Sequence, residues 1–289
     1  MKKTTKIILL AAIVLALAGA ALAAVRLYAH EKEQNEALRE LAEQMNVLQE
    51  EKQAAESGGQ SGERISGLES RITRLEVQAD YAEADYRWFA IGNSITVHAP
   101  NEVWWSETGM AASETSKDYV HLTAEALAGT KGKVSVHPLY FYEWETAEGN
   151  RGEKLDMLDP YLDPRLQLVT VQLGENAEDL TTFEQDLEAL IRRVQAKAPE
   201  ARILVIGDFW TSGEREQMKR EAAERTGAEF VSLEEIRDNP EYQAGIGAVV
   251  YDPEGNPHTV ENKDVAGHPG DRGMQYIADR LTEILTKEP

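Results

Sequence analysis

Residues 87–96 read RWFAIGNSIT, and this stretch decides the fold of the larger part of the chain. Residues 87–91 form a mostly apolar run that predicts a buried strand, and Gly92 permits a tight turn at its end. Ser94 then lies at the carboxyl edge of a sheet, where a hydroxyl can face a substrate as a nucleophile must. A serine in such a turn is also typical of plain turn chemistry or a helix N-cap, so its partners must decide its role.

Short apolar runs alternate with helical patterns through the rest of this region. The alternation predicts an α/β fold with a parallel sheet of about five strands, covered by helices on both faces. The predicted strands are 87–91, 133–140, 166–173, 202–207 and 229–232. The predicted helices are 118–127, 182–197, 213–226 and 270–286. Ligands of such sheets bind beyond the carboxyl ends of the strands, so chemistry is expected on residues that directly follow a strand.

Two further polar residues fall where they can reach Ser94. Asn176 follows the run 166–173, and its side-chain amide can donate a hydrogen bond at the same sheet edge. His268 precedes the last predicted helix, and serine needs such a base because its hydroxyl does not ionise at neutral pH. Taken singly, Asn176 is typical of a cap or turn and His268 of a surface loop. Their joint placement beside Ser94 favours catalysis.

Three blocks of this region resemble the SGNH (GDSL-like) hydrolases. Residues 89–96 resemble the first block, which usually reads Gly-Asp-Ser and here carries Asn93 in place of the aspartate. Residues 172–176 resemble the third block, Gly-x-Asn, and residues 267–269 resemble the fifth, whose histidine precedes the last helix. Two further stretches look like a bacterial, membrane-anchored branch of the superfamily: 105–113 and 206–210.

The resemblance implies a flavodoxin-like three-layer α/β/α fold and ester or acyl chemistry without a metal or cofactor. Ser94 would be the nucleophile and His268 the base, while the backbone N–H of Ser94 and the amide of Asn176 would hold the oxyanion. Trp105 and Gly174 are candidate substrate-binding residues. A tryptophan ring can stack on a sugar, although a tryptophan pair is also typical of simple packing.

Two departures from the family pattern affect the expected site. The family usually has aspartate three residues before its histidine, and Val265 stands there instead. Asp264, one place earlier, is a candidate to orient His268; the alternatives are a Ser–His dyad or a carbonyl in that role. The family's second block also supplies an oxyanion glycine, which residues 133–142 lack, and Gly109 is a weak substitute.

The N-terminus predicts export of the rest of the chain. Lysines precede an unbroken apolar run over 7–25, long enough for a membrane-spanning helix of about 20 residues. A cleaved signal peptide is the alternative, since residues 21–23 read Ala-Leu-Ala. We expect a transmembrane anchor over 1–28, a helical stalk over 29–84 and the hydrolase-like domain over 85–289, outside the cytoplasm on a cell membrane.

The stalk segment carries two short heptad patterns separated by a glycine-rich break. Their apolar positions are Leu38, Leu41, Met45 and Leu48, then Ile65, Leu68, Ile72 and Leu75. Such spacing predicts either a parallel coiled coil that makes a homodimer or a solvated stalk helix. A helix that lies on the globular domain is a third option.

The composition excludes some classes of partner and of catalytic site. A formal net charge of -21 argues against nucleic acid, whose phosphates would repel so acidic a surface. The chain has no cysteine, which excludes thiolate catalysis and Cys-type zinc sites.

The leading hypothesis is an extracytoplasmic serine esterase acting on an ester-bearing substrate, such as O-acetyl groups of surface glycan. The alternatives are a non-catalytic glycan- or ligand-binding domain on a dimeric stalk, and a purely structural surface protein.

Overall fold

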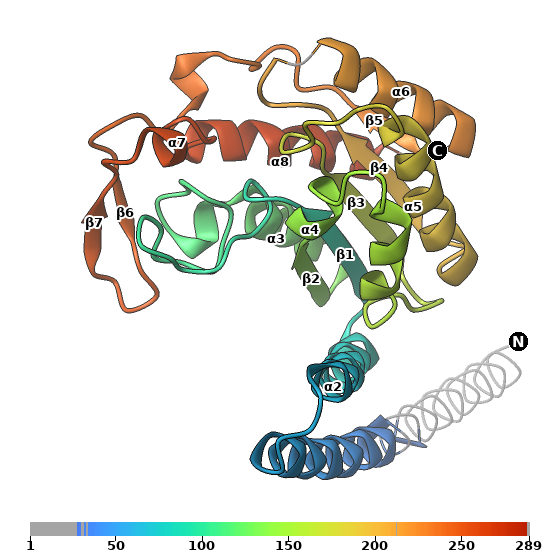
Figure 1. Cartoon of the computed structure of the whole chain (residues 1–289). Helices are drawn as coiled ribbons and strands as arrows, with labels where there is room; N and C mark the ends of the chain where they lie inside the picture. Colours follow the sequence, from blue (N-terminus) through green and yellow to red (C-terminus); the bar gives the residue numbers. More distant parts are fainter. Residues whose placement is uncertain (1–27, 30–31, 33, 212, 288–289) are drawn as a thin grey trace, which may run out of the picture. The chain divides into compact units, whose positions relative to one another are not determined.

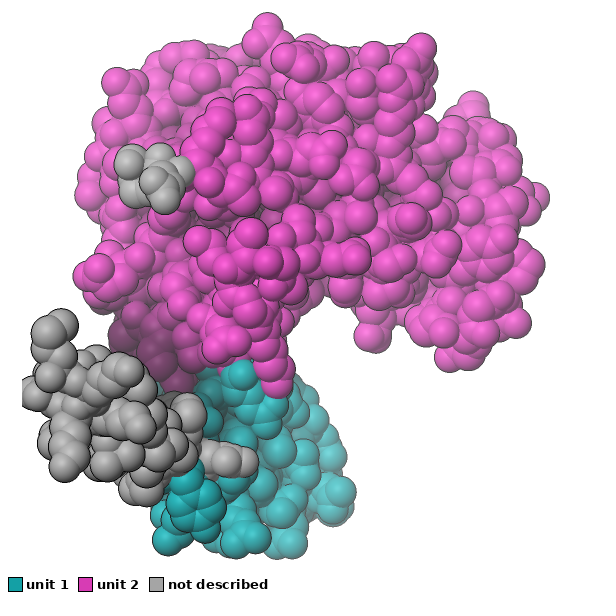
Figure 2. Space-filling model, turned by 180° about the vertical axis from the view of Figure 1, so that it is seen from behind, with its two compact units in different colours: residues 1–83 teal, residues 84–289 magenta. Residues whose placement is uncertain are grey.

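A computed structural model describes residues 28–29, 32, 34–211 and 213–287. The chain divides into two compact units, residues 1–83 and 84–289, which Figure 2 colours separately. The apolar run over 7–25 lies outside the described residues, so its predicted role as a membrane anchor stays a prediction. Within the described ranges, no helix combines the length and the apolar character that crossing a lipid bilayer requires.

The larger unit is built on one five-stranded sheet in which neighbouring strands run parallel, in the order β2-β1-β3-β4-β5. The strands are β1 Tyr86–Gly92, β2 Val134–Tyr140, β3 Leu168–Gln172, β4 Arg202–Ile206 and β5 Glu229–Val231. This confirms the predicted α/β fold with a parallel five-stranded sheet. The strand order is that of flavodoxin-like sheets, whose ligands bind at the switch point between β1 and β3.

Helices cover both faces of this sheet (Figure 1). Helix α3 (Tyr119–Lys131) packs with α8 (Asp271–Thr286) on one face, and α5 (Phe183–Lys197) packs with α6 (Gly213–Thr226) on the other. Alternate residues of each strand point to opposite faces. Trp88 and Ala90 of β1 therefore join the apolar residues of α3 and α8 in one core, while neighbouring Phe89 faces the other layer.

Short elements fill the connections of this unit. They are η1 (Thr115–Lys117), α4 (Tyr142–Glu145), η2 (Arg151–Leu158), η3 (Pro240–Tyr242), β6 (Val249–Tyr251), β7 (Pro257–Thr259) and α7 (Lys263–Ala266). Strands β6 and β7 pair antiparallel and form a hairpin whose turn lies between Tyr251 and Pro257. A small apolar cluster joins this hairpin to the loop after Ser94 and to α7: its buried members are Trp104, Met110, Ala111, Val250, Val260, Val265 and Ala266.

Between residues 34 and 83, the smaller unit contains two helices joined by a turn at the predicted glycine-rich break. Residues 34–57 form the first and α2 (Gly62–Glu83) the second. They run back along each other, because Leu48 and Ala55 pack with Leu68, and Lys52 Nζ lies 2.9 Å from Glu69 Oε1. Five of the eight heptad positions, Leu48, Ile65, Leu68, Ile72 and Leu75, thus pack within one chain, and pairing of two copies through the heptads stays a prediction.

Candidate functional site

Hydrogen bonds of Asn93, the residue before Ser94, hold the turn that carries Ser94. The backbone N–H of Asn93 donates to the Gln172 carbonyl at 3.2 Å, and the Asn93 side-chain oxygen accepts from the Ile95 N–H at 3.1 Å. A β-carbon on Gly92 would lie 1.8 Å from Thr96 Oγ1, so only glycine fits at this point of the turn. Ser94 therefore stands at the carboxyl end of β1, beside the switch point, as the sequence predicted.

The Ser94 hydroxyl meets the His268 ring although 174 residues separate them: Oγ lies 2.8 Å from Nε2. The other ring nitrogen, Nδ1, lies 2.7 Å from the backbone carbonyl oxygen of Asp264. A carbonyl can only accept, so Nδ1 carries the proton and Nε2 offers its lone pair to the serine hydroxyl. This is the arrangement that a general base needs.

The loop that holds His268 is fixed on several sides. The Asn262 side chain caps α7 by accepting from the N–H groups of residues 264 and 265. Trp210 packs edge-on against the imidazole with ring centroids 5.0 Å apart, and its Nε1 donates to the Gly267 carbonyl at 3.1 Å. The His268 carbonyl accepts from the Ala244 N–H at 3.0 Å. The ring is consequently held in one orientation before any substrate arrives.

Asp264 orients His268 through its main chain and not through its carboxylate. One turn of α7 places the carbonyl of Asp264 against the ring, while the side chain of Asp264 is exposed. Of the alternatives left open by the sequence, the geometry matches a Ser–His dyad with an orienting carbonyl. A carboxylate would also stabilise the charged imidazolium, and a neutral carbonyl does this less strongly.

Burial keeps the His268 ring neutral. Only 8% of the residue is exposed. Its pKa is lowered to about 4, mainly because burial disfavours the charged imidazolium; the bond to the Asp264 carbonyl opposes this, and a positive charge on His98 adds to it. At neutral pH the ring is thus available as a base.

Asn176 lies where the prediction put it, just after β3, but its amide already has a strong partner. Its Nδ2 donates to Glu145 Oε2 at 2.7 Å, which leaves the second N–H of the same group for another acceptor. No described residue accepts the backbone N–H of Ser94. Two N–H groups at this edge therefore remain for a developing oxyanion.

The glycines expected to contact substrate are engaged elsewhere. The N–H of Gly174 donates to Glu145 Oε1 in a short hydrogen bond, so this N–H is not free for a substrate. The N–H of Gly109 donates to Asp118 Oδ2 at 3.2 Å, so the suggested substitute for the missing oxyanion glycine does not serve. Gly174 has a φ of +125° and is needed for the shape of its loop.

Glu145 is the one central residue of this edge that sequence reasoning missed. It ends α4, and its side chain is fully buried among N–H donors from Asn93, Gly174 and Asn176. Burial, followed by the negative charge of Glu175, raises the pKa of Glu145, while these donors oppose the rise. The signal in the sequence was its position directly after the aromatic-rich run 140–144, of which Phe141 and Trp144 are fully buried.

Asn93 explains the departure from the family's Gly-Asp-Ser block. Its Nδ2 donates to Glu145 Oε1 at 3.2 Å and to Glu175 Oε2 at 2.9 Å. Aspartate at this position would bring a third carboxylate against two others and could not donate to either. A neutral amide satisfies both, because buried charges must be hydrogen-bonded or paired.

Positive charge beneath the site balances these carboxylates. Lys219 is fully buried and places Nζ 2.8 Å from Asp208 Oδ1, while Arg215 Nε lies 3.0 Å from Asp208 Oδ2. Burial lowers the pKa of Lys219, but Asp208 and Glu175 outweigh it and the net shift is upward. Lys219 therefore remains charged.

Trp105, predicted as a sugar platform, is already stacked on a protein ring. Its indole and the His258 imidazole are 4.5 Å apart and 8° from parallel. His258 Nε2 lies 3.0 Å from Asp252 Oδ2, which, with Asn256, lowers the pKa of Asp252 to about 2. One face of Trp105 thus braces the β6–β7 hairpin, and neighbouring Trp104 is fully buried.

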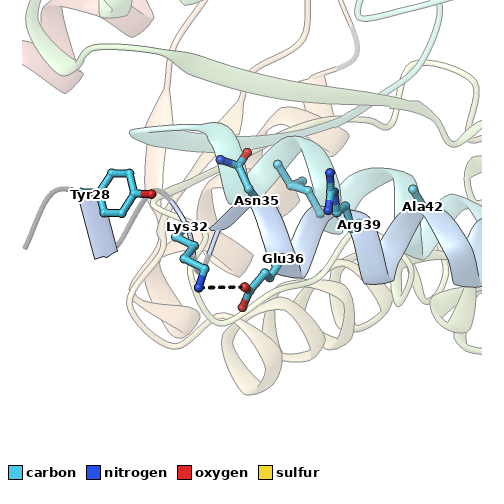
Figure 3. Close-up of a pocket in the computed structure, with 7 residues that line it drawn as sticks. Tyr28, Lys32, Asn35, Glu36, Arg39 and Ala42 are labelled. Atoms are coloured by element: carbon cyan, nitrogen blue, oxygen red, sulfur yellow. Dashed lines mark ion pairs between the residues drawn. The ribbon is translucent and has the colours of Figure 1, made fainter.

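A hollow in the smaller unit offers no comparable chemistry. Its lining residues, drawn in Figure 3, are Tyr28, Lys32, Asn35, Glu36, Leu38, Arg39 and Ala42. The polar side chains among them are exposed, and the Lys32–Glu36 ion pair is the kind of surface pair that is worth little. We therefore place the candidate site at Ser94 and His268.

We predict that the His268 imidazole titrates at about pH 4 in the folded protein, because burial disfavours its charged form. The unfolded chain binds this proton at about pH 6.5. As the pH falls from about 6.5 to about 4, the unfolded chain binds this proton more readily than the folded protein does, so the free energy of unfolding decreases. NMR detection of the imidazole signals, assigned with His268→Gln, measures the midpoint. A midpoint at the value of a free histidine would contradict the buried site.

Comparison with known proteins gives matches in structure only. No family model matches the chain, and no curated protein matches it. An extracellular lipase from Streptomyces rimosus is 15% identical, with 68% of this chain and 99% of the lipase covered and a TM-score of 0.42. A family two carbohydrate esterase from Clostridium thermocellum is 19% identical, with 70% and 63% covered and a TM-score of 0.46.

A protein from Parabacteroides merdae described as GDSL-like is 15% identical, with 69% and 95% covered and a TM-score of 0.45. At such identities these neighbours do not define the chemistry of this chain, and the function proposed below rests on the geometry of the site. By their descriptions, these three structural neighbours are a lipase, a carbohydrate esterase and a GDSL-like lipase.

Proposed function

We propose that the larger unit is a serine ester hydrolase that works with a Ser94–His268 dyad. One observation carries the proposal: Ser94 Oγ lies 2.8 Å from His268 Nε2, while Nδ1 faces a carbonyl oxygen at 2.7 Å. A purely structural serine and histidine have no need of this combination of contact, tautomer and low pKa. Clustered features of this kind at a sheet switch point are typical of active sites.

The first half of the reaction forms an acyl-enzyme. Ser94 Oγ attacks the ester carbonyl carbon while its proton passes to His268 Nε2. The carbonyl oxygen becomes an oxyanion and accepts from the Ser94 N–H and the Asn176 amide; one such donor is worth about 3 kcal/mol of barrier. The tetrahedral intermediate then expels the alcohol, whose oxygen takes the proton back from His268.

The second half releases the acid. Water loses a proton to His268 Nε2 and attacks the acyl carbon, and Ser94 leaves as the alkoxide that the same proton neutralises. Another acceptor hydroxyl can take the place of water, which would make the reaction an acyl transfer. Both routes use the same residues, and we propose hydrolysis as the main one.

We propose carbohydrate esters, such as O-acetyl groups on glycan, as the substrate class. Three aromatic side chains beside the site support this: Tyr140 at the end of β2, Tyr142 at the start of α4 and His98 in the loop after Ser94. Tyr140 and Tyr142 stack with ring centroids 5.9 Å apart, and His98 packs against Tyr140 at 4.9 Å. His98 is close enough to His268 to affect its pKa. Tyr142 is 40% exposed and offers a ring on which a sugar can pack.

We also propose that the domain acts outside the cytoplasm. The support comes from the sequence: a basic N-terminus, the apolar run 7–25 and a helical segment before the catalytic unit. A location outside the cell gives access to surface glycan. The strong negative charge keeps the domain away from anionic headgroups.

Ser94→Ala should lower kcat for p-nitrophenyl acetate at least about 10³-fold, since it removes the nucleophile. Asp264→Asn is the matched test of the dyad. A carboxylate in the orienting role is worth about 10⁴ in kcat, whereas a carbonyl survives this substitution, so Asp264→Asn should stay close to wild type. Steady-state kinetics of both variants decide the matter; unchanged turnover in Ser94→Ala would remove the proposed nucleophile.

Tyr142→Ala should raise KM for an acetylated oligosaccharide about 2- to 10-fold, the equivalent of about 0.5–1.5 kcal/mol of aromatic contact. Turnover of p-nitrophenyl acetate should not change, because this small ester does not reach the ring. Tyr251→Ala is the control, since Tyr251 is exposed to a similar extent, 42%, on the β6–β7 hairpin. Equal effects of the two substitutions would argue against a sugar platform at Tyr142.

Protease added to intact cells should remove a C-terminal tag from the full-length chain, because the domain is expected outside the cytoplasm. Retention of the chain in the washed membrane fraction would distinguish a kept anchor from a cleaved signal peptide. A tag that is protected in intact cells and cut only after lysis contradicts the proposed location.

A further inference from the structure

We infer that Glu145 is a positioning residue that holds both proposed oxyanion donors in place; the inference rests on the proposed esterase function. Its side chain is fully buried, so a substrate at the sheet edge does not reach it. Glu145 instead contacts Asn176 directly and contacts Asn93, the residue before Ser94. One carboxylate therefore connects the loop of Ser94 with the loop of Asn176.

The first part of this role is to choose which end of the Asn176 amide faces the site. Nδ2 donates to Glu145 Oε2 at 2.7 Å. A carboxylate only accepts hydrogen bonds, so turning the amide over would place Oδ1 against a negative oxygen. The NH₂ end is thereby fixed, and its second N–H keeps one direction in the plane of the amide. An oxyanion needs a donor at this point, and an unrestrained amide would present its oxygen part of the time.

The second part is to lock the two loops to each other. Glu145 Oε1 accepts from the Gly174 N–H and from Asn93 Nδ2, which lies 3.2 Å away. Asn93 also shapes the turn whose next residue, Ser94, supplies the other proposed oxyanion N–H. Displacement of Glu145 would therefore disturb both donors at once.

Glu145 is itself held rigidly. It ends α4, where Trp144 is fully buried, and Arg151 donates to the Glu145 carbonyl from Nε at 3.3 Å and from a terminal nitrogen at 3.0 Å. Burying a carboxylate costs several kcal/mol unless it is well bonded, roughly as for other buried ions. Glu145 is buried in spite of this cost, and the groups that it holds in place belong to the edge of the proposed site.

The location of Glu145 gives the inference a further basis. The family resemblance expects a glycine after β2 whose N–H would join the oxyanion site, and this chain has none in residues 133–142. The loop after β2 here contributes an acceptor that fixes the remaining donors. A site with fewer donors depends more on the placement of each of them.

The test compares Glu145→Gln with Glu175→Gln. Both replace a carboxylate that accepts from Asn93 by a neutral amide, but Glu175, which is half-buried, has no bond to Asn176: its other partners are Gln172 Nε2 at 2.8 Å and the Phe209 N–H at 3.4 Å. We expect Glu145→Gln to lower kcat for p-nitrophenyl acetate by about 10²-fold with KM little changed, as for a lost oxyanion donor. Glu175→Gln should keep most of kcat. Equal losses in the two variants would overturn the inference.

A double-mutant cycle with Asn176→Ala separates positioning from general damage. Glu145→Gln should lower kcat in the wild-type background and have little further effect once Asn176 is alanine. An equal loss in both backgrounds would overturn the role through Asn176. Thermal unfolding of each variant checks the fold, and Glu145→Asp, which keeps the charge but withdraws it from Asn176, replaces Glu145→Gln if that variant unfolds.

A readout that does not need turnover keeps this inference distinct from the proposed function. The ¹H–¹⁵N signals of the Asn176 side-chain amide should shift strongly in Glu145→Gln, which loses the direct hydrogen bond, and much less in Glu175→Gln. A wild-type protein without any esterase activity would overturn the proposed function and the positioning role with it. If the wild type is active and Glu145→Gln changes neither the Asn176 amide signals nor kcat, the positioning role alone would be overturned.

Discussion

Parallel pairing of β1 with β3 is the constraint on which the candidate site depends. The register sets Gly92 opposite Gln172, so the loops that begin with Asn93 and Leu173 leave the sheet side by side. The order β2-β1-β3-β4-β5 makes this pair the switch point, where the loops diverge and leave room for a ligand. His268 then reaches the same edge from the other end of the chain, held by α7 and the start of α8.

The carboxylates around this edge are stabilised mainly by hydrogen-bond donors of the protein, since Glu145 is fully buried and Glu175 is half-buried. Glu145 and Glu175 share the neutral amide of Asn93, and Lys219 supplies positive charge through Asp208. The donors that hold these carboxylates are main-chain and amide N–H groups, which have fixed directions. A rigid acceptor network of this kind arranges the remaining N–H groups before substrate arrives, which is the basis of oxyanion stabilisation.

Local patterns predicted most of the fold, because strand and helix periodicities are set by neighbouring residues. They also placed Ser94, Asn176 and His268 correctly at one edge. Glu145 could not be found this way, since its partners lie 31 and 52 residues away and its helix is a single turn. The sequence likewise left open whether the carboxylate of Asp264, a carbonyl or no third group orients His268, and one turn of α7 presents the carbonyl of Asp264. The roles of Glu145 and of the Asp264 carbonyl depend on the local direction of the backbone, and the spacing of residues along the sequence does not predict that direction.

Labelling with a fluorophosphonate tests the central claim most directly, because this reagent requires a serine whose proton is being removed by a neighbour. Intact mass at neutral pH should rise by one label, and peptide mapping should place the label on Ser94. The reaction should be lost in His268→Gln. Absence of label on Ser94, or labelling that proceeds equally well without His268, would contradict a shared proton between these two side chains.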